Sequence, residues 1–167
     1  IRRPNARKIS EKKNWGPASK GLAPRVFAVD DLSADGSLRT LYRPKNKRII
    51  DYAGEKVRNS VSLEREIRYL KRGHIWCFKL NRLYVRDAAV GGNIARYINH
   101  ACKPNCYTQI VGETIWIIAA RNIKSGEELT YDYGKDYFDI FLKPIGCQCD
   151  KCREKRKAER AEKRAKK

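Results

Sequence analysis

Three cysteines within six residues constrain this chain more than any other feature of its sequence. Cys147, Cys149 and Cys152 are separated by one residue and then by two. Such tight spacing is poor for disulfide bonds and good for gathering thiolates around one metal ion. The sequence therefore predicts bound zinc in a reducing compartment, with three disulfides among the six cysteines as the alternative.

The length and apolar content predict one compact domain. The chain has 167 residues, and 41% of them are hydrophobic, which is enough for a substantial core. Its first residues lack the charged-then-apolar pattern of a secretory signal, and no run of about 18 apolar residues indicates a membrane-spanning helix. We therefore expect an intracellular protein with no membrane partner.

The formal net charge of +19 is concentrated at the two ends of the chain. Residues 1–20 carry seven Lys or Arg against one acid, and residues 153–167 carry nine against three. Such ends attract nucleic acid, chromatin-like complexes or acidic surfaces through a force that depends on salt and not on sequence. A solvated tail without a dedicated partner is the equally weighted alternative.

The pattern of apolar and turn-forming residues predicts mostly short strands with little helix. One helix is expected at 62–72, with Ser62 as its N-cap, Glu64 to Glu66 in its first turn and Gly73 as its stop. The final segment, 152–167, lacks an apolar face and is either a solvated helix or a tail. The other expected elements are strands at 26–29, 49–53, 75–80, 83–85, 107–111, 114–120 and 128–133, and one or two helical turns at 93–98.

Three separated segments carry residues suited to chemistry, although each has an ordinary explanation on its own. Asn99 and His100 in the segment 93–106 could form a turn with a hydrogen-bonded histidine. Tyr131 and Tyr133 share one strand face, where such pairs more often pack in a core. Only the cysteine triplet is a strong signal when taken alone.

Taken together, in this order and spacing, the three segments resemble the SET-domain family of protein lysine methyltransferases. The matching motifs are Arg-Tyr-Ile-Asn-His-Ala-Cys at 96–102, Gly-Glu-Glu-Leu-Thr-Tyr-Asp-Tyr at 126–133, and a post-SET cysteine segment at 147–152. Tyr-Ala-Gly-Glu at 52–55 and Tyr-Val-Arg-Asp-Ala at 84–88 match two further motifs. The resemblance covers roughly residues 20–152 and is highly specific.

The resemblance implies a fold of several small curved sheets with short helices, ending in a C-terminal pseudoknot and a zinc-bound tail. No cysteine-rich pre-SET region lies upstream of the matching motifs, so we expect a bare SET plus post-SET unit. The expected divisions are a basic arm at 1–19, the SET domain at 20–134, the post-SET segment at 135–152 and a basic tail at 153–167.

The activity implied is transfer of a methyl group from S-adenosylmethionine to a lysine side chain. The amine must first lose its proton, although the free pKa of lysine is about 10.4. A desolvated aromatic channel disfavours the ammonium form and aligns the amine. Tyr52, Tyr131 and Tyr133 match the tyrosines that line this channel, with Tyr133 in the catalytic position. A tyrosine at position 131 is typical of enzymes that favour mono- or dimethylation.

The same resemblance assigns the cofactor and zinc residues. Cys102 matches the ligand that the SET core adds to Cys147, Cys149 and Cys152 to complete a structural zinc site, with Cys106 as its competitor for the fourth place. The chain departs from the family where Gly21 stands in for a later Gly-x-Gly loop and where Trp76 replaces a usual tyrosine. The residues implied in cofactor binding are Arg96, Asn99, His100, Gln148, Gly21 and Trp76.

Most relatives of this architecture modify histones, so a histone lysine is the favoured substrate, with nucleic-acid or nucleosome contact through the basic termini. The nucleus or chromatin is expected in a eukaryote or for a host-directed effector, and the cytoplasm for an endogenous bacterial protein. Two alternatives remain open. One is an inactive SET-like scaffold that binds chromatin or nucleic acid through its basic ends. The other is a zinc ribbon, for which a second compact cysteine pair is lacking.

Overall fold

The computed structural model describes residues 36–72 and 75–166. The expected arm at 1–19, the strand at 26–29, Gly21 and the predicted helix stop at Gly73 lie outside these residues. The helices of the described part are α1 (Asn59–Lys71), α2 (Lys135–Tyr137), α3 (Asp150–Ala165), the 3-10 turn η2 (Ile94–Tyr97) and the π turn η3 (Phe138–Leu142). Its strands are β1 (Arg39–Thr40), β2 (Arg48–Asp51), β3 (Glu55–Arg58), β4 (Cys77–Lys79), β5 (Tyr84–Asp87), β6 (Asn99–His100), β7 (Cys106–Val111), β8 (Thr114–Ala119), β9 (Glu127–Glu128) and β10 (Thr130–Tyr131).

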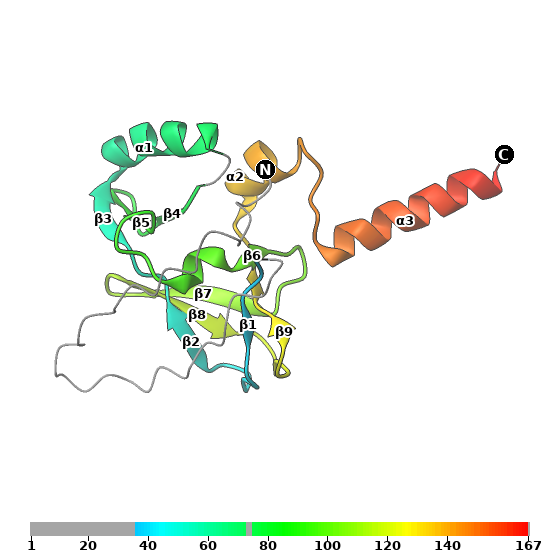
Figure 1. The fold of residues 1–167 in the computed structure, drawn as a ribbon, viewed down its shortest axis with the longest axis horizontal. Helices are drawn as coiled ribbons and strands as arrows, with labels where there is room; N and C mark the ends of the chain where they lie inside the picture. Colours follow the sequence, from blue (N-terminus) through cyan, green and yellow to red (C-terminus); the bar gives the residue numbers. More distant parts are fainter. Residues whose placement is uncertain (1–35, 73–74, 167) are drawn as a thin grey trace.

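These strands form four small sheets within the described residues, which confirms the expected fold class (Figure 1). The two larger sheets have the strand orders β2-β8-β7 and β3-β5-β4, and the two-stranded ones pair β1 with β9 and β6 with β10. The predicted hairpin is present as β7 and β8, where Val111 faces Thr114. Gly112 occupies its turn with a φ of 59°, a left-handed conformation that glycine adopts without steric cost.

The core lies where β8 meets the segments on either side of it. Strand β8 is rich in β-branched residues, and its Ile115 and Ile117 are fully buried. Ile98, Leu129 and Leu38 pack into the same cluster from segments far apart in sequence. Ile98 therefore holds the chain against the core immediately before the Asn-His motif at 99–100.

Helix α1 begins three residues earlier than predicted, and the expected N-cap is wrong. Ser62 lies inside the helix, buried, with its hydroxyl bonded to Glu66. The residue before the helix, Arg58, makes no side-chain cap bond, and no acid lies in the first turn. Asn59 instead bonds back to the β4–β5 turn, through its N–H to Leu83 (3.0 Å) and its side chain to Arg82 (2.5 Å). Tertiary contacts thus fix where this helix starts.

The predicted strand at 128–133 is interrupted at Leu129. Residues before it belong to β9, which runs antiparallel to β1, and residues after it belong to β10, which runs parallel to β6. Leu129 is fully buried, and its N–H donates to the carbonyl of Leu38 (2.8 Å). The chain therefore passes from one sheet to another at a residue that anchors both to the core.

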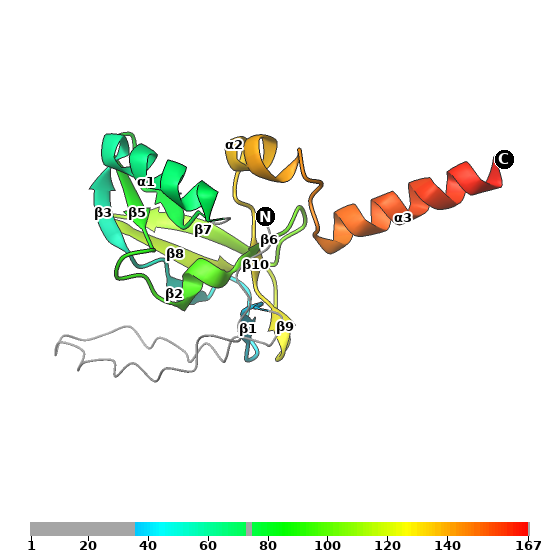
Figure 2. The same cartoon turned by 45° about the horizontal axis from the view of Figure 1, so that its top comes forward.

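The C-terminal segment is a helix rather than a tail. Helix α3 projects away from the body in both views of Figures 1 and 2. Within the described part of the helix, no residue is buried, as its lack of an apolar face predicts. None of the described helices is long and apolar enough to cross a bilayer.

Candidate functional site

The parallel pairing of β6 with β10 brings the Asn-His motif to the tyrosine motif. Asn99 lies opposite Thr130, and His100 lies opposite Tyr131. Two residues further on, the N–H of Tyr133 donates to Nδ1 of His100 (3.3 Å), and its hydroxyl donates to the carbonyl of Ile98 (2.6 Å). Residues about thirty positions apart in sequence thus meet at one place.

A continuous series of aromatic rings surrounds this junction. The ring centroids are 5.2 Å apart for Tyr52 and Phe78, 5.9 Å for Phe78 and Tyr131, and 4.9 Å for Tyr131 and Tyr133. Tyr137 extends the series at 5.0 Å from Tyr133. The structure therefore brings all three predicted tyrosines together in one aromatic cluster.

The hydroxyls of Tyr52 and Tyr133 are held in the same manner. Tyr52 is buried, and its hydroxyl donates to the carbonyl of Trp76 (2.9 Å), as that of Tyr133 does to Ile98. A phenol has a single proton to donate. Toward any further polar group, each hydroxyl can therefore act only as an acceptor.

Arg96 contacts Trp76, another predicted cofactor residue, and the loop that follows β5. Its guanidinium lies 4.9 Å above the ring of Trp76 and donates to the carbonyl of Ala88 (3.0 Å) and the hydroxyl of Tyr97 (3.0 Å). Its Nε is buried and has no acceptor among the described residues, and such an orphaned donor fits a bound polar group. The unsatisfied Nε of Arg96 is therefore consistent with a polar cofactor bound beside Arg96 and Trp76.

Asn99 is oriented by a neighbour that the sequence did not single out. Its side-chain amide donates to the carboxylate of Glu128 (2.6 Å). Phe78 and Tyr137 are likewise members of the site that sequence reasoning missed. Phe78 could have been found because it lies two residues from Trp76 in a strand and so shares its face. Glu128 lies inside the matching motif at 126–133, although no role was assigned to it, whereas no local pattern distinguishes Tyr137 from a surface residue.

Four cysteines converge on one point, as the sequence predicted. The sulfurs of Cys102, Cys147, Cys149 and Cys152 all lie within 4.8 Å of one another. The sulfur of Cys102 is 3.9 Å from that of Cys147 and 3.6 Å from that of Cys152, and tetrahedral thiolates around zinc would lie about 3.8 Å apart. The cluster therefore has the chemistry and the spacing to hold a zinc ion.

The alternatives for the cysteines are not supported. All six are free thiols, so none forms a disulfide. Cys106 lies elsewhere, buried in β7, where its thiol donates to the side chain of Asn105 (3.4 Å). Burial raises the pKa of Cys106 to about 12, so it stays a neutral thiol at neutral pH. Cys102, and not Cys106, completes the cluster.

The cluster already favours one thiolate. Burial opposes ionisation of Cys149, yet the N–H groups of Cys102 and Cys152 donate to its sulfur and hold its pKa at about 7. Burial raises the pKa of both Cys102 and Cys147. A metal ion would supply the positive charge that these buried thiols need in order to lose their protons.

Gln148 lies at the cysteine cluster and not at the Asn-His motif. It is exposed, its side-chain amide donates to Gly146 (2.8 Å), and its oxygen accepts from Arg156 (3.5 Å). Among the described residues, no hydrogen bond connects it to Asn99 or His100. Its assignment to the cofactor remains a prediction.

A family comparison agrees with this geometry. Residues 26–134, more than half of the chain, match the family model described as the SET domain. The chain belongs to the SET-domain family. The β6–β10 junction and its tyrosines lie inside the matched region of this SET domain, and the cysteine triplet lies beyond it.

Proteins similar in sequence to this chain are named as histone-lysine methyltransferases. The chain is 44% identical over 111 residues to the histone-lysine N-methyltransferase trithorax of Drosophila virilis, and 40% identical over 135 residues to the histone-lysine N-methyltransferase set1 of Dictyostelium discoideum. These matches cover 63% and 77% of this SET-domain chain, but only 3% and 8% of the relatives. Among solved structures, it resembles a chain in the crystal structure of the Chaetomium thermophilum polycomb repressive complex 2, with 29% identity and a TM-score of 0.57. That match covers 63% of this chain and 14% of the other.

His100 links the two halves of the site. Burial lowers the pKa of its imidazole, against the opposing charge of Asp132, so the ring is neutral at neutral pH. Because Nδ1 accepts the N–H of Tyr133, the single proton lies on Nε2, which is 3.4 Å from the sulfur of Cys102. One side chain therefore contacts both the tyrosine segment and the cysteine cluster.

Proposed function

We propose that this SET domain transfers a methyl group from S-adenosylmethionine to the side-chain amine of a lysine. The observation that carries the proposal is the parallel pairing of β6 with β10. In this pairing Asn99 and His100 lie beside Tyr131 and Tyr133, which supports a shared site for the residues that we assign to the cofactor and to the lysine. The names of the relatives support the reaction class.

The chain's own residues would prepare the amine. The aromatic series around Tyr131 disfavours a buried ammonium, which lowers the pKa of the entering lysine and favours its neutral form. Tyr52 and Tyr133 then accept N–H bonds and fix the direction of the nitrogen lone pair. When bound, S-adenosylmethionine supplies the methyl group on a positively charged sulfur.

Cofactor binding is assigned to the residues around β6. Asn99, held by Glu128, and the backbone of His100 would bind the methionyl amine and the adenine edge. Arg96 and Trp76 form the adjoining wall through their stacked side chains. Gln148 would reach the adenine from the cysteine cluster, and Gly21 would approach the carboxylate.

The cysteine cluster is proposed to hold one structural zinc ion. Cys102 comes from the SET core and the other three cysteines from the tail, so the metal would dock the tail beside the tyrosines. We keep the proposed division into a SET domain at 20–134, a post-SET segment at 135–152 and a basic tail at 153–167. Helix α3 crosses the last of these boundaries.

The proposed substrate is a histone, because the relatives are named as histone-lysine methyltransferases. A chromatin location follows from that substrate. Mono- or dimethylation is proposed because position 131, which is buried beside Tyr133, carries the tyrosine that the family resemblance associates with low methylation states.

The decisive experiment is transfer of labelled methyl from S-adenosylmethionine to free histones, nucleosomes and a cell lysate, with mass spectrometry of the product lysines. Tyr133→Phe should lower the rate about 100-fold or more while cofactor binding is retained. Tyr107→Phe, on the exposed face of β7, is the matched control and should keep full activity. Absence of both transfer and cofactor binding in the wild type would overturn the proposal in favour of the inactive scaffold.

A second variant tests the methylation state. Tyr131→Phe removes one hydroxyl beside the amine and should raise the share of trimethylated product without abolishing transfer. Mass spectrometry of the product lysine measures the three states separately. A wild-type enzyme that already yields mainly trimethyl-lysine would contradict the assignment of Tyr131.

A further inference from the structure

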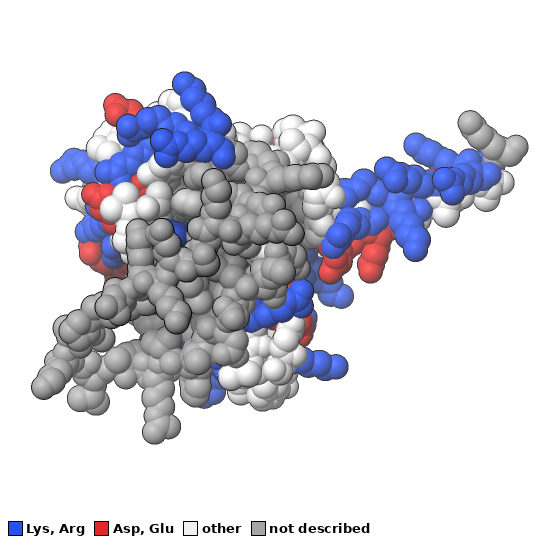
Figure 3. Space-filling model, viewed as in Figure 1, with Lys and Arg blue, Asp and Glu red and all other residues white. Residues whose placement is uncertain are grey.

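Helix α3 carries most of its cations on one face. At 3.6 residues per turn, six cations fall within about 120° of the helix circumference. This basic stripe consists of Arg153, Arg156, Lys157, Arg160, Lys163 and Arg164. All acids of the helix lie outside it, at Asp150, Glu154, Glu159 and Glu162. Most of the stripe lines one hollow beside the helix, and Figure 3 shows Lys and Arg gathered along α3.

Most cations of the stripe are uncommitted. Arg153 pairs with Asp150 (2.6 Å), and Arg156 donates to the carbonyl of Cys147 (2.7 Å). Lys157 and the three cations beyond it in the stripe have no carboxylate within ion-pair distance in the part of the chain that the structure describes. On the opposite face, by contrast, Lys155 pairs with Glu159 (3.8 Å).

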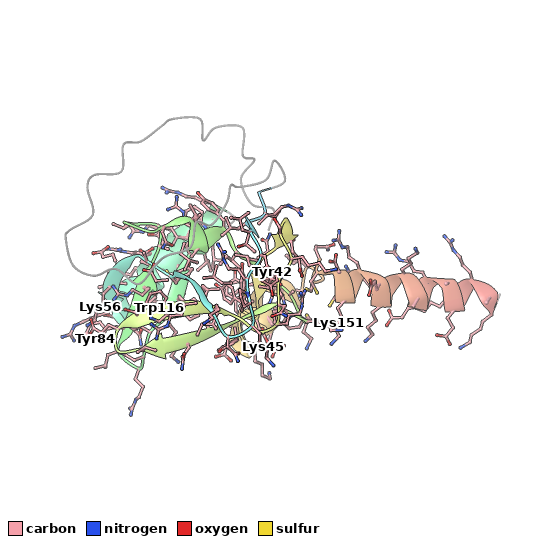
Figure 4. All side chains as sticks on the ribbon, turned by 90° about the horizontal axis from the view of Figure 1, so that it is seen from below. Tyr42, Lys45, Lys56, Tyr84, Trp116 and Lys151 are labelled. Atoms are coloured by element: carbon pink, nitrogen blue, oxygen red, sulfur yellow. The ribbon has the colours of Figure 1, made fainter. Side chains whose placement is uncertain are left out.

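Two cations on the body illustrate a different environment, in which the charge is held against a ring or a carboxylate. Lys56 lies 4.3 Å from the ring of Tyr84 and pairs with Glu113, and Arg48 lies 4.7 Å from the ring of Trp116. Figure 4 shows Lys56, Tyr84 and Trp116 together at one end of the body, while the side chains of α3 extend clear of it. The stripe therefore stands clear of the body and is accessible along its length.

The composition of the helix favours a phosphate backbone over a protein groove as the partner of the stripe. A protein groove that receives a helix needs apolar anchors, and among the described residues α3 offers only alanines besides Cys152 at its base. The stripe runs for about 16 Å along a straight helix. Duplex DNA carries one charge for about every 1.7 Å of its axis, so a row of cations meets a matching row of phosphates. Arginine forks also bind phosphate oxygens in pairs.

We propose that the basic stripe of α3 binds the phosphate backbone of duplex DNA without reading its sequence. The inference does not depend on methyl transfer, since it rests only on the charges of the helix. Combined with a histone substrate, it would hold the domain on the DNA beside the histone. The body and the first turn of α3 would keep their contacts while the outer turns meet the phosphates.

Two triple variants of the zinc-loaded full chain test the proposal. Arg160→Ala with Lys163→Ala and Arg164→Ala removes three cations from the stripe. Lys151→Ala with Lys155→Ala and Lys166→Ala removes two cations from the rest of the helix and one from its C-cap, and is the matched control (Lys151 is labelled in Figure 4). Both variants carry the same net charge, both keep the N-terminal residues, and alanine preserves helix propensity. Circular dichroism checks that the helix is intact.

Binding is measured by fluorescence anisotropy with a labelled DNA duplex over a range of salt concentrations. The stripe variant should bind about tenfold or more weakly, and its salt slope should fall by about 2–3. The control should stay within about threefold of the wild type. Equal weakening of both variants, or no effect in either, would overturn the proposal. Methyl transfer to a free histone peptide, measured alongside, should be unchanged and reports on the proposed function separately.

A final arm separates DNA from an acidic protein surface. Poly-glutamate of matched charge is added as the competitor for the labelled duplex. Displacement only at a large excess of poly-glutamate supports recognition of the phosphate backbone. Displacement at equal charge concentration would assign the stripe to acidic protein surfaces and refute the proposal.

Discussion

At the residue scale, two adjacent glycines near the proposed cofactor residues are required for different structural reasons. A Cβ at Gly92 would lie 2.1 Å from the carbonyl oxygen of Ala88, which also accepts a bond from Arg96. Gly91 has a φ of +62° but open space around it. Gly92 is therefore required for close approach of two backbone segments, and Gly91 only for its left-handed conformation.

Alanine substitutions should separate these two effects. Gly91→Ala should cost about 1 kcal/mol in the free energy of unfolding, because only backbone strain is added. Gly92→Ala should cost about 3 kcal/mol or more, because the backbone at Ala88 must move. Urea unfolding measures both variants. Equal costs, or a larger cost for Gly91→Ala, would contradict the close approach.

Single residues could be predicted from the sequence where their signal is local. The cysteine triplet was recognised from spacing alone, and Tyr131 and Tyr133 from a motif within one short segment. Glu128 lies in the same motif, but its bond to Asn99 could not be predicted because the two residues are 29 positions apart. The roles assigned to the tyrosines and to the cofactor residues remain predictions.

At the element scale, Glu127 stabilises the turn that leads into β9. Its carboxylate accepts from Arg121, from the N–H of Lys124 (3.1 Å) and from the side chain of Asn105 (3.3 Å). The Arg121 hydrogen bond, helped by the others against burial, lowers the pKa of Glu127 to about 2. This turn positions the strand that precedes the tyrosine motif.

This carboxylate should make stability depend on acidity. Its pKa is lower in the folded chain than the unfolded value of about 4.3, so the stabilisation is present above that pH and is lost as pH falls toward about 2. With allowance for solvent screening, the loss is about 1–2 kcal/mol. Glu127→Gln should flatten the curve of unfolding free energy against pH by this amount. Parallel curves for the variant and the wild type would refute the prediction.

Elements defined by local pattern were predicted better than their boundaries. The β7–β8 hairpin, the pairing of the strands around 75–80 and 83–85, and the helical turn at 94–97 follow from alternation and turn residues. The start of α1 and the break at Leu129 did not, because contacts with Leu83 and Leu38 decide them. The helical state of the C-terminal segment was left open, since charge alone does not distinguish a solvated helix from a tail.

At the scale of the whole molecule, the cysteine cluster joins the core to the tail. Cys102 is 45 positions from Cys147 and 50 from Cys152, so one metal ion would close a long loop. The buried hydrophobic cluster, by contrast, is built from residues between Leu38 and Tyr131. Core packing and tail docking therefore rest on separate interactions.

Removal of zinc should release the tail and spare the core. In the presence of a chelator, trypsin should first cut between residue 135 and the end of α3, while the core resists digestion. Cys152→Ala should lower the zinc content of the purified protein from about one ion per chain and give the same cleavage. Cys106→Ala is the matched control and should keep its zinc. Loss of zinc in Cys106→Ala alone would contradict the ligand set.

The attachment of α3 at its base has a geometric consequence. Arg156 binds the carbonyl of Cys147, and Cys152 belongs to the sulfur cluster, so the helix is fixed near its beginning. The helix is about 24 Å long, and a tilt of about 20° at the base would carry its far end about 8 Å. The arrangement of the four sulfur atoms at the base thus determines where the outermost arginines lie. A small shift of the sulfur cluster would therefore move the far end of α3 much further than its base, without altering any residue on the helix.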